Sequence, residues 1–423
     1  MKRLFITIFI ILIILFGLHF SISVIVTKSV ETALSILSEE PGRDLTYSRV
    51  HTRPYAAVVT ISDFTYTGTD YPARFSSGEL NLKLSHADFF RIVFSPSETT
   101  FGKIARYDIQ ASSFMYQHDE HALFLISEEA VWTQEGSLQD FSNSVFSGIL
   151  PSGHHRFSVK LENPEFSIGS VTSLPGFTAG NGLMNTGLIT IDVEYTPEDH
   201  RFHIREFVAE NEANRAELRG NAQLHVSGDS LLPHRIDLEF HLDATSPDYQ
   251  VTIPGNPGVL NAGNLQATLL TTVDILNGDL NTDDLVLRFS AGRAVINPST
   301  AMEQQLQPMF RMLGVPFQPL AISRLEGEVL LLENRLEFAV REAETAFTKV
   351  RFNMVTFLGE EDLPASQLAG GTFELYDMDP SVVQLVRGLE TFMRWQLQWD
   401  GNRVYVPVSG TVGRPQLTGI TTR

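Results

Sequence analysis

The sequence contains no cysteine among its 423 residues. Disulfide frameworks, thiolate metal sites and cysteine nucleophiles are therefore excluded. Positive charge is also scarce, because 31 Lys and Arg stand against 50 Asp and Glu, which gives a net charge of -19. Nucleic-acid binding needs a basic surface, so this balance argues against a nucleic-acid partner. It argues equally against a peripheral protein that holds anionic lipid by its overall charge.

Recognisable catalytic motifs are missing as well. The sequence has no Gly-x-Ser-x-Gly, Walker-type loop, dinucleotide fingerprint or His-Glu-x-x-His. The densest group of ligand-type side chains, His118 to His121, consists of neighbours in sequence, whereas metal ligands usually converge from different elements. This favours a solvated turn. We expect no metal, no cofactor and a non-enzymatic function, with a hydrolase that uses paired carboxylates as the alternative.

One long apolar run stands out, from Leu4 to Val26, directly after Lys2 and Arg3. It contains no charge and has the length of roughly 20 residues that a membrane-spanning helix needs. Because the cations precede it, the N-terminus is predicted to lie in the cytoplasm and the bulk of the chain in the periplasm, anchored to a bacterial inner membrane. The alternative is a cleaved signal peptide whose apolar core ends at Phe16.

The remaining chain changes from helical to strand periodicity. A helical pattern continues to Glu40 and stops at Pro41-Gly42, and alternation with a period of two begins near Leu45. The Gly-, Ser- and Pro-rich stretch Ser170–Gly187 predicts the main internal boundary. The predicted organisation is a signal anchor and stalk helix in residues 1–40, an N-terminal β region in 41–175, and a C-terminal β region in 176–423 with helices near 300–313 and 379–394.

The clearest alternation lies in Ile189–Tyr195, Ala216–Val226 and Arg235–Asp243. Successive side chains of a strand point to opposite faces, so these segments predict amphipathic strands, and their short connections predict an antiparallel meander. Similar strand–turn–strand units follow, which leaves a true internal repeat open. The predicted fold is mainly β, an elongated and curled antiparallel sheet that forms either a groove or a packed sandwich.

The apolar strand faces allow two interpretations. They can pack on one another as a sandwich core, or they can line a groove for acyl chains, since burial of each methylene contributes about 0.8 kcal/mol. In the groove interpretation, the candidate lipid-facing residues are Ile191, Val193, Leu218, Leu224, Leu238 and Phe240.

Several segments resemble a known family. After the apolar run, DLTYSRV (Asp44–Val50), ISDFTYTG (Ile61–Gly68) and GELNLKLS (Gly78–Ser85) are similar to the start of AsmA-like bacterial envelope proteins. Near the C-terminus, Gly370–Val386 and Val406–Gly419 resemble the way that superfamily closes its sheet. The resemblance implies an inner-membrane protein that binds or guides phospholipid, or supports envelope assembly, without catalysis. The alternative is a scaffold that recruits another envelope protein through its β-sheet.

Overall fold

The structure is a computed structural model. It describes residues 21–418 except 33, 36–37, 39–41, 69–72, 95–102, 119–121, 138–139, 141–149, 170–177, 181–182, 227–232, 246–248, 253–257, 277–278, 301–302, 305–306, 309–310, 312–317, 359–364, 395 and 413. The predicted span therefore lies outside the described residues up to Phe20. In the part that is described, no helix is long and apolar enough to cross a membrane.

The chain divides into two compact units. Unit 1 contains residues 1–212 and 227–232, and unit 2 contains residues 213–226 and 233–423. Every strand pairing described in either unit is antiparallel, which confirms the predicted mainly β, antiparallel class. The predicted boundary segment Ser170–Gly187 contributes two short strands to unit 1, and the sequence-based domain limits stay predictions.

Unit 1 is a meander in which most strands pair with the next one along the chain. The ladder is interrupted at two places, where β1 and β2 share β3 as a partner and β7 and β8 share β6. The elements are β1 (Arg43–Thr46), β2 (Arg49–Arg53), the 3-10 turn η1 (Pro54–Ala56), β3 (Val58–Gly68), β4 (Ala73–Leu84), α2 (His86–Phe94), β5 (Arg106–His118), β6 (Leu123–Glu135), β7 (His155–Glu162), β8 (Glu165–Ile168), β9 (Thr178–Gly180), β10 (Leu183–Asn185), β11 (Leu188–Thr196) and β12 (Arg201–Glu210).

A line of interrupted strand pairing crosses the unit 1 sheet, and we call it the crease. The ladder skips Asp63 and its opposite residue Gly78 between β3 and β4, and Ser113 and its opposite residue Glu128 between β5 and β6, without a shift of register, and Asn163 lies in the break between β7 and β8. Asp63, Ser113 and Asn163 have positive φ, at 51°, 49° and 47°. Asp, Asn and Ser have short polar side chains, and Asp and Asn are the non-glycine residues that tolerate this conformation best. Because a left-handed residue interrupts the extended backbone, the crease divides these strands into two arms.

The left-handed residue also changes which positions share a face. In β3, Ile61 and Phe64 pack in one apolar cluster although they are three residues apart. In β5, Ala111 and Phe114 do the same in a second cluster. The left-handed residue therefore keeps the apolar side chains of both arms on the same side of the sheet.

Serine hydroxyls stabilise the crease. Ser77 Oγ donates to the carbonyl of Ser112 at 2.9 Å, and Ser127 Oγ donates to that of Glu162 at 2.7 Å. Both serines are buried, at 3% and 4% exposure. Buried backbone carbonyls need hydrogen-bond donors, and the two serine hydroxyls supply them where the regular ladder is interrupted.

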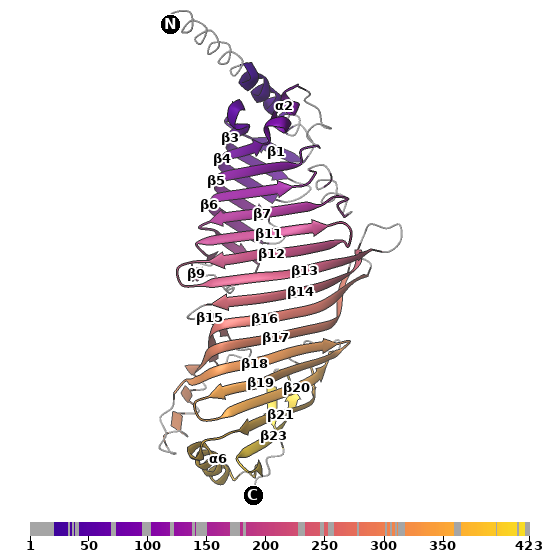
Figure 1. The fold of residues 1–423 in the computed structure, drawn as a ribbon. Helices are drawn as coiled ribbons and strands as arrows, with labels where there is room; N and C mark the ends of the chain where they lie inside the picture. Colours follow the sequence, from indigo (N-terminus) through magenta and orange to yellow (C-terminus); the bar gives the residue numbers. More distant parts are fainter. Residues whose placement is uncertain are drawn as a thin grey trace, which may run out of the picture. The chain divides into compact units, whose positions relative to one another are not determined.

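One end of unit 1 is covered by helices (Figure 1). Residues 21–32 are helical, and Val26 and Leu34 enter a core cluster with Val59 and Phe89 of β3 and α2. Ser23 Oγ also lies 2.8 Å from Thr52 Oγ1 of β2. The helix that follows the apolar N-terminal segment is thus part of the unit 1 core.

Unit 2 continues the same architecture with longer strands. Its ladder runs from β13 through β14, β16, β17, β18, β19, β20 and β21 to β23, with β15, β22 and β24 as short additions. The elements are β13 (Arg215–Val226), β14 (Pro233–Thr245), β15 (Tyr249–Thr252), β16 (Gly258–Leu276), β17 (Asp279–Pro298), β18 (Leu320–Leu332), β19 (Arg335–Thr345), β20 (Lys349–Phe357), β21 (Leu368–Tyr376), α6 (Pro380–Met393), β22 (Gln398–Asp400), β23 (Arg403–Thr411) and β24 (Arg414–Leu417).

Unit 2 has its own crease. The register skips Asn264 and Gly292 between β16 and β17, and Asn264 has a φ of 52°. It skips Ser323 between β18 and β19. Ile322 and Leu325, three residues apart, then join one apolar cluster, as in unit 1.

The predicted C-terminal helix and hairpin are confirmed. Asp379 caps α6 by accepting a hydrogen bond from Ser381 N at 2.9 Å, and Pro380 occupies the first turn. The helix packs on β21 and β23 in a cluster around Met378. Gly401 and Asn402 connect β22 and β23, where Asp400 pairs with Arg403. In the predicted helix at 300–313, the described residues 300, 303–304, 307–308 and 311 are helical.

Candidate functional site

The candidate site is the apolar side of each sheet, which we call the inner face. In unit 2 one cross-strand row consists of partners from five neighbouring strands of the ladder: Phe240, Leu269, Leu287, Val329 and Phe338. Every member of this row is half-buried rather than buried. A sheet face that packed against a second layer would bury such a row, so this face is open in the described part of unit 2.

The inner face of unit 2 carries no charged side chain at its described positions. Along β14 the inner residues are Ile236, Leu238, Phe240, Leu242 and Ala244, and the same apolar composition extends through the register. The inner positions of the neighbouring strands are Leu218, Gly220, Ala222, Leu224, Leu265, Ala267, Leu269, Thr271, Val273, Leu285, Leu287, Phe289, Ala291, Leu325, Gly327, Val329, Leu331, Leu336, Phe338 and Val340.

Two aromatic rings lie over glycines on this face. A Cβ on Gly327 would come within 2.4 Å of Phe289 Cζ, and one on Gly220 would come within 2.5 Å of Phe240 Cδ1. Phe289 and Phe240 are the direct cross-strand partners of these glycines. The glycines therefore give the rings space to lie flat against the sheet, which leaves the inner face smooth.

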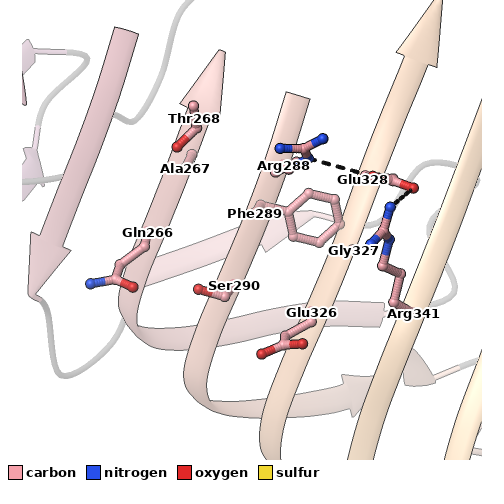
Figure 2. A pocket seen from close by; sticks show the side chains of 10 residues that line it. All are labelled: Gln266, Ala267, Thr268, Arg288, Phe289, Ser290, Glu326, Gly327, Glu328 and Arg341. Atoms are coloured by element: carbon pink, nitrogen blue, oxygen red, sulfur yellow. Dashed lines mark hydrogen bonds and ion pairs between the residues drawn. The ribbon is translucent and has the colours of Figure 1, made fainter. Parts of the chain in front are cut away.

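Burial rises toward the crease. Ala244, Ala291 and Ala343 are 3%, 2% and 5% exposed, and Ala294 is 1% exposed. Figure 2 shows the strands that carry Gln266 and Ser290 turning sharply just beyond these residues. Small side chains are needed where two arms approach each other, so the inner face is packed at the crease and open farther along the arms.

Unit 1 has an inner face of the same kind. Its central row joins Ile109, Trp132, Val159, Ile191 and Phe207 across five strands. Trp132 is 40% exposed in the middle of this row. The unit 1 row is therefore not fully covered at Trp132 in the described part of the chain.

The predicted lipid-facing residues all lie on the inner faces. In unit 1, Ile191 and Val193 are half-buried neighbours on β11. In unit 2, Leu218 pairs with Leu242, and Leu224 pairs with Ile236. Leu224 is only 8% exposed and packs more tightly than the others. Their contact with lipid stays a prediction.

The opposite side of unit 2, which we call the outer face, is charged. Glu328 is 8% exposed and lies between Arg341 and Arg288, whose Nε is 3.7 Å away. These residues border a pocket of about 280 Å³ together with Gln266, Thr268 and Glu326, and with Phe289 and Gly327 of the inner face (Figure 2). Both arginines are paired with Glu328, and Glu326 is paired with Arg324, which does not line the pocket.

The histidine groups of the sequence do not converge. Among the described residues, no set of three His, Asp or Glu side chains could hold a metal ion. His118 is buried at 1% exposure, and the rest of its motif lies outside the described residues. His154 contacts Glu198, whereas its neighbour His155 points into unit 1.

A buried contact that sequence inspection missed joins His155 and Asp140. His155 Nε2 lies 2.9 Å from Asp140 Oδ2, and the His155 side chain is fully buried. Burial by itself raises the pKa of the Asp140 carboxyl, but hydrogen bonds from His155, Ser152 and the Gly153 amide outweigh it and lower the pKa to about 2. Ser152 donates to Asp140 rather than to the histidine, so the group is a structural clasp and not a nucleophile–base pair.

These features define a mainly β protein with open apolar sheet faces. Comparisons with protein-family models, with curated proteins and with solved structures found no significant match.

Proposed function

We propose that this is a membrane-anchored periplasmic protein that binds acyl chains on its inner faces and guides lipid or supports envelope assembly without catalysis. The observation that carries this proposal is the inner face of unit 2, which is apolar and free of charge over its described positions yet half-exposed in its central row. Exposed contiguous apolar surface of this extent is typical of ligand or membrane contact.

The chemistry of the inner face favours the hydrocarbon part of a lipid. Each buried methylene contributes about 0.8 kcal/mol, so roughly ten methylenes would supply about 8 kcal/mol before the costs of ordering the chain. With no charged group on the described inner face of unit 2, a polar headgroup has no partner there. The headgroup therefore stays in water while the acyl chain lies along the sheet.

Membrane attachment is supported by the sequence and by the helix that continues from it. Leu4–Val26 has the composition of a membrane span. Its last residue, Val26, is 1% exposed in the unit 1 core, so we infer that the part within the membrane ends before Ser23. A retained anchor is thereby favoured over a cleaved signal peptide, because Ser23 and Val26 both contribute to the folded unit.

Bound phospholipid in the purified full chain tests the proposal. The protein is extracted in detergent, washed, and examined by native mass spectrometry. A variant with Leu238→Gln and Phe240→Gln on the inner face should retain several-fold less phospholipid than the parent. The matched variant with Glu239→Gln and His241→Gln, on the outer face of the same strand, should retain the parent amount. Equal retention in both variants would contradict lipid binding by the inner face.

A second candidate function is the recruitment of a protein partner. Leu270, Leu332 and Phe357 on the outer face of unit 2 are 37%, 60% and 54% exposed. Val286 and Leu330 lie beside Leu270 in the register. Apolar residues on a face that is otherwise charged favour contact with another protein. A photo-crosslinker at Leu332 that gives one dominant protein adduct in cells would support this function, and adducts to lipid alone would exclude it.

A further inference from the structure

The first paired strands of unit 1 carry an exposed basic face within a strongly acidic protein. In β2, Arg49, His51 and Arg53 are exposed and alternate with the buried Val50 and Thr52. The strand therefore presents three basic side chains on one side and packs into the core with the other. This local arrangement is opposite in sign to the net charge of -19.

These cations are not neutralised within the described part of the chain. Neither Arg49 nor Arg53 forms an ion pair with any described residue, although Arg53 Nη2 lies 3.5 Å from Thr60 Oγ1. Lys83 lies in the same cross-strand row as Arg53, since both pair with Val58, and its other partner is Asp108. Two acids of neighbouring strands, Asp63 and Glu79, accept hydrogen bonds from Ser48 and Asn81 rather than from the arginines.

The basic face lies where the N-terminal helix joins the sheet. Thr52, between the exposed His51 and Arg53, donates a hydrogen bond to the Ser23 carbonyl at 2.9 Å. The turn η1 follows β2 directly and exposes 64% of Tyr55. Val24 and Ile25, on the side of the helix away from the core, are 39% and 48% exposed. Apolar, aromatic and cationic side chains are thus combined at the helix that continues the apolar N-terminal segment.

We propose that β2 and η1 form a docking surface for an anionic bilayer, with Arg49, His51 and Arg53 facing lipid headgroups and Tyr55 inserted at the interface. Charge complementarity selects this occupant, because each cation near an anionic membrane strengthens binding about fivefold. Tyrosine is enriched at the membrane–water interface, where its ring is buried and its hydroxyl is hydrated.

Docking would place the outer side of β2 against the bilayer. Val59 and Ile61 of β3 are direct partners of β2 and lie on the opposite, inner face. The contact would therefore fix the position of unit 1 at the bilayer and leave the inner face directed away from the headgroups. The inference rests on the proposed membrane anchoring and adds to it a specific, charge-dependent contact.

A single fluorophore tests this docking. The chain has no cysteine, so Tyr55→Cys provides one labelling position for an environment-sensitive nitrobenzoxadiazole dye. The full chain is reconstituted into vesicles of phosphatidylcholine alone, or of phosphatidylcholine with about 30% phosphatidylglycerol. Quenching of the dye by a nitroxide attached to the lipid headgroups is then measured in both kinds of vesicle. We expect strong quenching in the anionic vesicles, weak quenching in the neutral ones, and loss of the difference at high salt.

Charge reversal provides the second measurement. Arg49→Glu with Arg53→Glu should reduce the docked-to-free ratio at least about 25-fold, from about fivefold for each cation. The matched control, Arg74→Glu with Arg201→Glu, changes the charge of unit 1 equally at exposed positions outside β2 and should leave quenching unchanged. Equal quenching in both vesicle types, or no effect of the β2 charge reversal, would overturn the docking surface. The cations would then have the role of preventing β2 from pairing with another chain at the sheet edge.

Two further readouts separate this inference from the proposed function. Flotation of the same vesicles reports anchoring by the apolar N-terminal segment, whatever the state of β2. Phospholipid retention reports the inner face. Loss of flotation would contradict the anchoring itself, whereas normal flotation with unquenched dye at position 55 would contradict only the docking surface. If the cysteine at position 55 were protected from labelling in cells, but not in vesicles that contain only this protein, the docking surface would also be overturned, in favour of a protein partner.

Discussion

The ring of Phe289 lies so close to Gly327 that a Cβ on the glycine would come within 2.4 Å of Phe289 Cζ. The two residues are direct cross-strand partners on β17 and β18. This pairing lets a large aromatic side chain lie against the sheet on the open inner face.

The first prediction concerns this contact. Gly327→Ala should lower the free energy of unfolding by about 1–3 kcal/mol, because the added methyl group forces the ring or the backbone to move. Urea unfolding measures the change. Gly370→Ala is the matched control, since a Cβ there meets nothing within 4 Å. Phe289→Leu in the Gly327→Ala background should recover part of the loss, and an unchanged midpoint for Gly327→Ala would contradict the close packing.

The second prediction tests the crease of unit 1. Ser113 has a φ of 49° and is exposed, so its main effect is on the backbone. Ser113→Val should destabilise unit 1 by about 1–2 kcal/mol, because a β-branched residue disfavours the left-handed region. Ser113→Gly should be neutral or stabilising. A chain that tolerates valine as well as glycine would show that the backbone at residue 113 is regular strand.

The third prediction uses pH. The pKa of Asp140 is lowered to about 2 in the folded state, against about 3.9 for an unfolded aspartate. Its ionised form therefore stabilises the fold fully above about pH 4, and this contribution is lost as the pH falls toward 2. Asp140→Asn should cost roughly 2 kcal/mol at pH 6, and the difference from the parent should become small near pH 2 and disappear below it.

The control for this pH effect is Asp44→Asn, since Asp44 is exposed on β1. Thermal unfolding of the parent and both variants from pH 2 to 7 separates a specific clasp from a general loss of charge. An Asp140→Asn penalty that does not depend on pH would contradict the ionic contribution of the clasp.

The fourth prediction tests the register of unit 2. Leu218 and Leu242 are direct partners, whereas Leu218 and Phe240 are diagonal neighbours. Direct partners have Cα atoms about 4.5–5.5 Å apart, which a disulfide can bridge, and diagonal neighbours are about 7–8 Å apart. Cysteines at 218 and 242 should therefore oxidise readily in this otherwise cysteine-free chain, and cysteines at 218 and 240 should not. The reverse order of oxidation would show a different register.

The sequence predicted the regular strands well. Arg235–Asp243 alternates without interruption and lies within β14, and Ala216–Val226 lies within β13. In these segments one face is uniformly apolar, so the period of two is visible without tertiary information. The helix at 379–394 was equally readable, because Asp379 and Pro380 mark its start.

The creases could not be predicted in the same way. Tyr55–Tyr66 reads as one strand, but Asp63 has a left-handed backbone, and the apolar positions change there from odd to even numbers. Tyr55 itself belongs to η1 rather than to β3, because Pro54 begins a 3-10 turn. A single left-handed residue changes the alternation by one position, which pattern analysis treats as noise.

The exposure of the inner face could not be predicted from the sequence either. Leu238 and Phe240 have the same sequence pattern whether their face is covered or open. Their half-buried state in the middle of the unit 2 sheet follows from the arrangement of neighbouring strands. The basic face of β2 was hidden by the net charge of -19, which averages over the whole chain.

Lipid contact in living cells tests the central claim most directly. A photo-reactive phenylalanine analogue is placed at Phe240 on the inner face, or at the adjacent His241 on the outer face, in full-length chains labelled with radioactive phosphate. The inner-face claim predicts phospholipid adducts from position 240 after irradiation and none above background from position 241. Equal labelling at both positions, or labelling at neither, would contradict an inner face that binds acyl chains.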